Sequence, residues 1–194
     1  MTEIKYQVAS IHEAGHVIAT LTTGCLLYHC IVGNVKGESK DNSLGTVSRG
    51  INTRQHGQRH SAVISISGAM SEYLHVHKNF NLTEFLDMFA TKAKYNSDIK
   101  NCEGYSWELA ALESKRELLR RWENLERLIK KLKQPKNHNR VIGAAELFQM
   151  AGCRLLDSRK LPVPKRLVQG RINHYSDAGY YQWQMNRFSR RIMA

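Results

Sequence analysis

The 194-residue sequence predicts a mainly α fold of the α+β class, in which helices surround a small sheet of two or three strands. First, apolar residues recur at helical spacing through most of the chain up to residue 156. Second, two short stretches, residues 26–32 and 45–49, have the composition of strands. Third, the chain is 42% hydrophobic and 24% charged, which is typical of a globular protein with a sizeable core.

The N-terminal part is expected to form one helix followed by two strands. Residues 6–24 have an apolar face at near-helical spacing, and Gly24 is suited to end the helix. That face consists of Val8, Ile11, Val17, Ile18 and Leu21. The run 26–32 suits a buried strand, residues 33–43 have the composition of a loop, and residues 45–49 suit a more exposed strand.

The rest of the domain is expected to be helical. We expect helices over residues 58–77, 82–94, 107–133 and 140–156, and residues 98–102 are expected to open a helix. Residues 95–97 and 134–139 are expected to break the helical pattern. The longest helix has one apolar stripe, formed by Leu109, Leu112, Leu118, Leu119, Trp122, Leu125, Leu128, Ile129 and Leu132. We therefore divide the chain into a domain over residues 1–156 and a basic, aromatic-containing tail over residues 157–194.

The first predicted helix contains the pentapeptide His12-Glu13-Ala14-Gly15-His16, which has the HExxH pattern of zinc peptidases. Residues four apart lie on one face of a helix, so both imidazoles can bind one zinc ion. Glu13 would lie beside the open coordination position, where it can take a proton from a zinc-bound water. The motif therefore predicts His12 and His16 as metal ligands and Glu13 as the catalytic base.

The segment from Ala9 to Ala19 closely resembles the active-site helix of the M41 peptidases, the protease domain of the FtsH family. Two further segments resemble the same family: Leu44-Gly45-Thr46-Val47 its edge strand, and Gly68-Ala69-Met70-Ser71-Glu72 a later helix. The resemblance covers residues 6–102 and implies a zincin helical domain with a small sheet. FtsH proteins also carry an ATPase, but this sequence has no GxxxxGK[ST] phosphate loop. We therefore expect a stand-alone form that does not use ATP.

The same resemblance implies a third zinc ligand. Asn96-Ser97-Asp98-Ile99 is similar to the family segment whose Asp binds zinc, so Asp98 is the implied ligand. Two imidazoles and one carboxylate leave zinc with a net positive charge that polarises water and a scissile carbonyl. Glu72 is the alternative third ligand, and otherwise a hydrogen-bond partner of a ligand. If Asp98 does not bind zinc, it is expected to be a helix N-cap. His75 and His77 are weaker candidates for the third ligand.

Gly45, Thr46 and Val47 are the predicted substrate-binding residues. An unpaired strand edge beside the zinc can bind an extended peptide through backbone hydrogen bonds, with loose side-chain preference. The alternative is an edge that the chain's own loops cover.

The net charge of +12 is concentrated in the second half, where residues 99–194 carry 20 Lys+Arg against 9 Asp+Glu. The stretch from Arg154 to Arg191 mixes basic and aromatic residues, a composition that can bind nucleic acid by phosphate contacts and base stacking. No known nucleic-acid-binding motif is present, so a solvated tail is the favoured interpretation.

The chain has neither an apolar run of transmembrane length nor the start of a signal peptide. We expect it to act without a membrane in the cytoplasm of a bacterium or of a phage-infected cell. Its four cysteines form no CxxC pair and are expected to be buried free thiols: Cys25, Cys30, Cys102 and Cys153.

Together these features predict an ATP-independent zinc metallopeptidase that hydrolyses peptide bonds in unfolded or flexible protein segments. M41-like domains assemble into rings, partly through their ATPase, so an oligomer is an open alternative to a monomer. Two other functions stay open: a non-proteolytic, metal-bound regulator that binds a protein partner, and a nucleic-acid-associated protein acting through its basic half. Glu13 argues against the regulator, because binding alone needs no general base.

Overall fold

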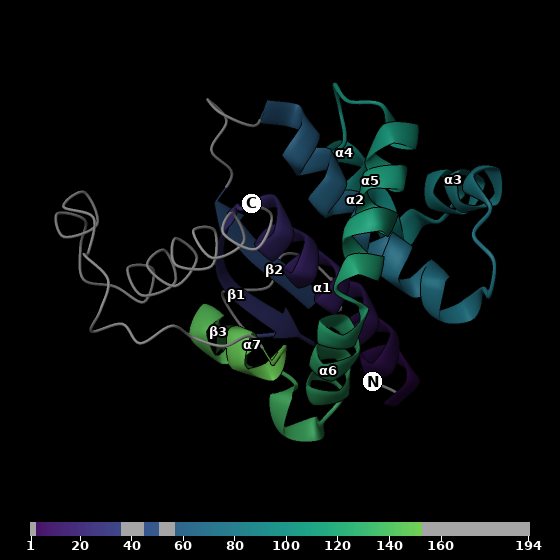
Figure 1. The fold of residues 1–194 in the computed structure, drawn as a ribbon. Coiled ribbons are helices and arrows are strands. Elements are labelled where there is room, and N and C mark those ends of the chain that lie inside the picture. Colours follow the sequence, from purple (N-terminus) through teal and green to yellow (C-terminus); the bar gives the residue numbers. More distant parts are fainter. Residues whose placement is uncertain (1–2, 36–44, 51–56, 153–194) are drawn as a thin grey trace, which may run out of the picture.

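The computed structural model describes residues 3–35, 45–50 and 57–152 (Figure 1). This part is mainly helical with one small antiparallel sheet, which confirms the predicted fold class. The helices are α1 (Glu3–Thr23), α2 (Gly57–Val76), α3 (Leu82–Thr91), α4 (Asn96–Lys100), α5 (Trp107–Arg120), α6 (Trp122–Leu132) and α7 (Ala144–Met150). The strands are β1 (Leu26–Val32), β2 (Gly45–Gly50) and β3 (Val141–Gly143), and two 3-10 turns, η1 (Ala93–Tyr95) and η2 (Pro135–Asn137), complete the order. The predicted tail, residues 157–194, lies outside the described residues.

The sheet has the order β2-β1-β3, and both pairs are antiparallel. Its third strand corrects the prediction of one helix over residues 140–156, because residues 141–143 pair with β1 and α7 begins only at Ala144. The two β-branched residues Val141 and Ile142 favour the extended backbone, and Ile142 is fully buried in the core.

The predicted helix over residues 107–133 is two helices. The backbone leaves the helical conformation at Arg121, with φ −121° and ψ 27°, so the chain changes direction between α5 and α6. As a result α5 packs against α2 whereas α6 packs against α1. The prediction of one continuous apolar stripe was therefore wrong: Leu109, Leu112 and Leu119 of α5 are exposed, and Ala110, Ala111, Ser114 and Leu118 are its buried residues.

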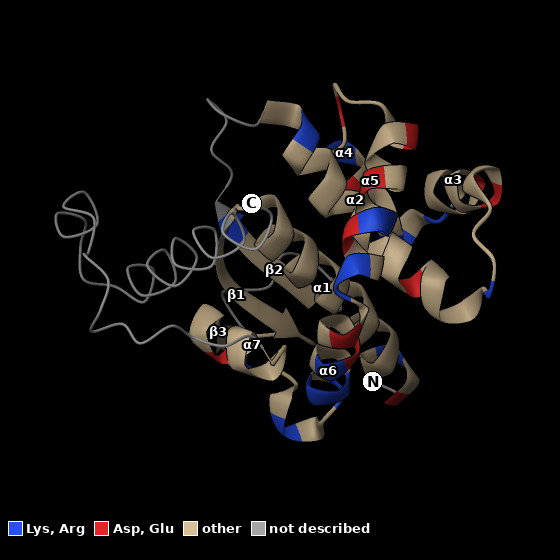
Figure 2. Cartoon of the chain, in the orientation of Figure 1, with Lys and Arg blue, Asp and Glu red and all other residues tan. Residues whose placement is uncertain are grey.

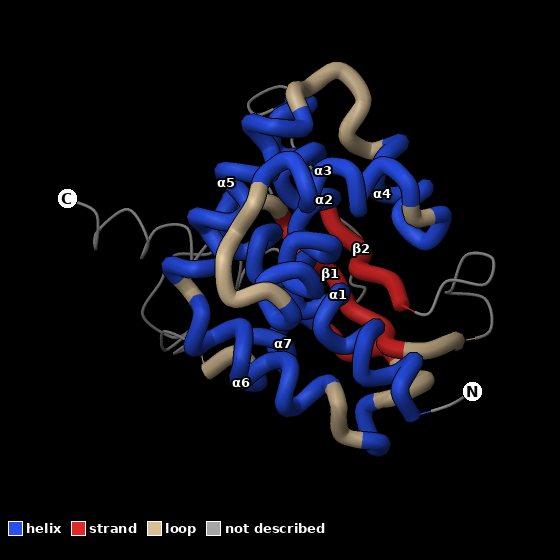
Figure 3. Tube along the Cα trace, turned by 90° about the vertical axis from the view of Figure 1, so that its right-hand side faces the viewer, coloured by secondary structure: helices blue, strands red, loops and turns tan. Residues whose placement is uncertain are grey.

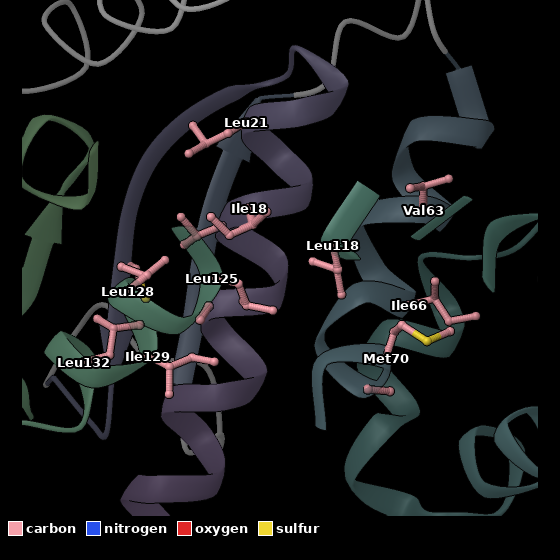
Figure 4. Close-up of a cluster of buried hydrophobic side chains, with 14 of the residues drawn as sticks. Ile18, Leu21, Val63, Ile66, Met70, Leu118, Leu125, Leu128, Ile129 and Leu132 are labelled. Atoms are coloured by element: carbon pink, nitrogen blue, oxygen red, sulfur yellow. The ribbon is translucent and has the colours of Figure 1, made fainter. Parts of the chain in front are cut away.

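Helix α1 lies in the middle of the domain, between the sheet and α2 (Figures 1 and 3). Its contact with α2 is close because of Gly15, where an added Cβ would lie 2.8 Å from Ser71 Cβ and nearer still to the Ser67 carbonyl. On another side α1 meets α6 through large aliphatic side chains (Figure 4). They include Ile18, Leu21, Leu125, Leu128, Ile129 and Leu132.

The segment between α3 and α5 contains η1 and α4, and α4 packs against α2. The break predicted at residues 95–97 lies earlier, at the extended Lys92, so the helix predicted over 82–94 ends at Thr91 and η1 runs directly into α4. The buried Tyr95 explains the continuity: its ring stacks on Phe89 at 5.6 Å and on His12 at 5.9 Å between centroids, which fixes the backbone of this segment. None of the described helices is long and apolar enough to cross a membrane.

Candidate metal centre

Three predicted ligands meet at one point between α1 and α4. The Nε2 atoms of His12 and His16 are 3.0 Å apart. The Asp98 carboxylate faces both, with Oδ2 3.2 Å from His12 Nε2 and Oδ1 3.5 Å from His16 Nε2. One ligand atom from each residue lies within 4.8 Å of the others, so this group could hold a metal ion. Asp98 is the third residue of α4 and not its N-cap.

The outer nitrogens of both imidazoles face acceptors. His12 Nδ1 lies 2.8 Å from a carboxylate oxygen of Glu72, and His16 Nδ1 lies 2.7 Å from the backbone carbonyl of Ile64. Neither oxygen can donate, so each Nδ1 carries a proton and donates it. In the neutral imidazoles both Nε2 lone pairs therefore point to the shared site, which is the orientation that metal binding requires.

The carboxylates around this point favour the binding of a cation. Asp98 is only 7% exposed, and its Oδ2 has no partner of hydrogen-bond geometry among the described residues. Burial opposes ionisation of Asp98, but the neighbouring His16 and His12 hold the pKa of its carboxyl well below the usual range. Burial likewise lowers the pKa of His12, but Asp98, Glu72 and Glu13 together raise it to about 10. A divalent metal ion would satisfy the same carboxylates while leaving both Nε2 atoms as ligands.

Glu72, the alternative third ligand, lies on the other side of His12. Besides His12 Nδ1, its carboxylate contacts Lys94 Nζ and accepts a hydrogen bond of 3.3 Å from the Tyr95 hydroxyl. Burial raises the pKa of Glu72, but His12 and Lys94 outweigh burial and lower it. Glu72 therefore orients the His12 ring, and Asp98 is the carboxylate that faces the shared point.

Glu13 lies beside the three ligands, where β2 passes α1. It is 5% exposed, and its Oε2 has no hydrogen-bond partner among the described residues. Burial raises the pKa of the Glu13 carboxyl, His12 and His16 lower it, and the net direction is upward. A carboxylate whose pKa is raised towards neutrality is a better proton acceptor than a solvated one.

The predicted substrate residues Gly45, Thr46 and Val47 begin β2. This strand pairs with β1 and forms the outer strand of the described sheet. Gly45 lies directly against the Glu13 side chain, which places the start of the strand beside the expected base. Leu44 of the same sequence match lies outside the described residues.

The weaker candidates are not brought to the site. His75 contacts Glu126 at 2.9 Å and the Ser71 carbonyl at 2.8 Å, while His77 lies 3.4 Å from Glu84. The described cysteines Cys25, Cys30 and Cys102 are buried free thiols, as predicted, and Cys153 lies outside the described residues.

Sequence analysis missed several residues that shape the site. Lys94 and Tyr95 bind Glu72, and the Ile64 carbonyl binds His16. Arg49 of β2 donates to the Ser65 hydroxyl at 2.6 Å and places a positive charge that lowers the pKa of Glu13. These contacts join segments that are far apart in the sequence. The only hint in the sequence is that Tyr95 directly precedes the segment that contains Asp98, which places it near the predicted site.

Compared with known proteins, the sequence matches no family model and no curated protein at a significant level.

Proposed function

We propose that this chain is a zinc metallopeptidase with an active site like that of the M41 peptidases. The observation that supports the proposal most strongly is the convergence of His12 Nε2, His16 Nε2 and the Asp98 carboxylate within 4.8 Å, beside a buried Glu13. A metal site with a carboxylate held next to it is the arrangement that metal-assisted hydrolysis requires.

Zinc is the metal that we propose. Two imidazole nitrogens and one carboxylate oxygen are a frequent donor set of catalytic zinc, although non-haem iron binds a similar set. Zinc supplies a Lewis acid that polarises the scissile carbonyl and lowers the pKa of a water ligand. The presence of Glu13 favours zinc over iron. Hydrolysis uses a general base in this position, whereas oxygen activation by iron does not need Glu13.

Glu13 carries the proton in the proposed reaction. Its carboxylate accepts a proton from the attacking water as the water oxygen bonds to the peptide carbonyl carbon. The same proton then passes to the leaving nitrogen as the C–N bond breaks, which returns Glu13 to its ionised form. Water is the only co-reactant, and the products are a carboxylic acid and an amine, which become a carboxylate and an ammonium ion at neutral pH.

The substrate is proposed to lie along β2 as an extended segment. A peptide that adds to this outer strand would run past Gly45 and therefore past Glu13. Backbone pairing requires an unfolded or flexible segment, so we propose that this chain cuts such segments without ATP.

The test is metal analysis of the purified full chain combined with cleavage of a chemically unfolded, fluorescently labelled protein. We expect zinc in an equimolar amount, cleavage that a chelator abolishes, and recovery of cleavage when zinc is returned. A chain that binds zinc but never cleaves would favour the regulator. A chain that binds nucleic acid in a salt-dependent way, with no effect of Glu13→Gln, would favour the nucleic-acid-associated alternative.

A further inference from the structure

Two glycines come close to the candidate site from different elements. Gly68 belongs to α2 and Gly45 begins β2, and neither has a left-handed backbone that would itself require glycine. Their importance lies in what a side chain at each position would meet.

A side chain at Gly68 would enter the place where the ligands meet. A Cβ there would lie 2.6 Å from both His12 Nε2 and His16 Nε2, closer than the 3.0 Å that real Cβ atoms essentially never cross. Zinc–nitrogen bonds are about 2.0–2.1 Å long, so a methyl group at this point would compete with the metal for the same space.

Helices α1 and α2 pack closely next to this point, so moving them apart would cost contacts. Gly15 lies against Ser67 and Ser71 of α2 at distances that leave no space for a side chain. Ser67 is in turn fixed on its other side by a hydrogen bond of 2.8 Å to the Ser114 hydroxyl of α5. The three atoms nearest to a Cβ at Gly68 all lie at the ends of the His12 and His16 side chains, so the imidazoles are the groups that must move.

A side chain at Gly45 would displace the expected base instead. Its Cβ would lie 2.6 Å from Glu13 Cγ, 2.7 Å from Glu13 Cδ and nearer still to Oε1, and these are the three atoms nearest to it. The buried carboxylate would have to turn away while the metal ligands keep their places.

We propose that Gly68 and Gly45 are two separate positioning residues, Gly68 for the metal and Gly45 for Glu13. The role of Gly68 rests only on the metal site, and the role of Gly45 rests on the proposed peptidase function. The two substitutions should therefore separate metal binding from proton transfer.

The experiment compares Gly68→Ala, Gly45→Ala and the control Gly143→Ala in the full chain. Gly143 has φ −70°, and an added Cβ there has no described atom within 4 Å. Zinc content after dialysis, zinc affinity in competition with a chelating dye, and cleavage of the unfolded test protein are measured for each variant.

We expect Gly68→Ala to weaken zinc binding at least about tenfold and to lose cleavage with it. Gly45→Ala should keep the parent's zinc affinity but cleave about 10²–10⁴-fold more slowly, which is the usual contribution of a general base. Gly143→Ala should match the parent in both. Parental zinc affinity in Gly68→Ala, or parental cleavage in Gly45→Ala, would overturn the corresponding half of the proposal.

A stability cycle tests both contacts without any activity. Gly45→Ala should lower the unfolding midpoint in the parent but not in a Glu13→Ala background, because Glu13 is the side chain that the new Cβ meets. In the same way His12→Ala should restore part of the midpoint lost in Gly68→Ala, even if that variant is too unstable for zinc measurements. Equal midpoint losses in both backgrounds would contradict the proposed contacts, whereas a failure of the parent to cleave would contradict only the peptidase function.

Discussion

The face of α1 that meets α2 and the face that meets α6 differ in the size and polarity of their side chains. The face towards α2 carries Gly15 and two histidines, and they pack against Gly68 and buried serines of α2. Towards α6 the contact consists of leucines and isoleucines, and every buried residue of α6 is aliphatic (Figure 4). Small residues let polar groups approach closely, whereas large aliphatic ones bury area. One helix therefore carries two candidate metal ligands on one face and buries large aliphatic side chains on the other.

The charged residues of α5 and α6 are mixed in sign, and the chain after α6 is basic. Figure 2 shows acidic and basic residues on both α5 and α6, and only basic residues on the turn that follows α6. The four lysines near this end are Lys130, Lys131, Lys133 and Lys136. Lys130 and Lys131 are exposed residues in the last turn of α6, as expected for the solvated face of an amphipathic helix, whereas Lys133 is its C-cap and Lys136 belongs to η2.

The largest effect is expected from Glu13→Gln, at a residue that lies next to the histidines of α1 and against β2. The variant should bind zinc as the parent does and cleave about 10²–10⁴-fold more slowly, because the amide cannot accept the proton. Zinc content and the rate on the unfolded test protein measure the two properties. His12→Ala is the control that should lose both, and cleavage by Glu13→Gln at the parental rate would mean that another group is the base.

Leu128→Ala should weaken the packing of α6 against α1 and leave the metal site unchanged. Leu128 is fully buried, and removal of a buried leucine side chain costs about 2–5 kcal/mol of unfolding free energy. Denaturant unfolding measures this loss. Zinc bound per folded chain should stay equal to the parent, and a coupled loss of zinc affinity would show that the two faces of α1 are not independent.

Glu72→Gln should have an intermediate effect, on the metal alone. The amide keeps the size of the side chain but weakens the contact that orients His12, so zinc affinity should fall about 10–100-fold. At saturating zinc the cleavage rate should return close to that of the parent. If saturating zinc leaves cleavage abolished, Glu72 has a direct role in the reaction.

Leu112→Ala should have the smallest effect. Leu112 is 46% exposed on α5, and substitutions at such positions usually change stability by less than about 0.5 kcal/mol. It is the matched control for Leu128→Ala in the same unfolding experiment. A loss as large as that of Leu128→Ala would show that α5 buries this side chain in solution.

The sequence predicted those parts of the molecule that depend on local pattern. The HExxH spacing is a property of one helix, and the strands predicted over residues 26–32 and 45–49, which correspond to β1 and β2, follow from short apolar or β-branched runs. The break at Arg121 was missed because the leucine pattern continues through it, and whether a leucine is buried depends on which helix lies opposite. Asp98 came from a resemblance and not from spacing, since its approach depends on Tyr95 packing against Phe89 and His12. Glu72 was left between two roles because the sequence cannot say which nitrogen of His12 it faces.

The most direct test of the account is X-ray absorption at the zinc edge of the full, zinc-loaded chain. We predict a first shell of nitrogen and oxygen at about 2.0–2.1 Å with the outer scattering of two imidazoles, and loss of that pattern in His16→Ala. A shell that contains sulfur at about 2.3 Å would place the metal on cysteines, and would contradict binding by His12, His16 and Asp98.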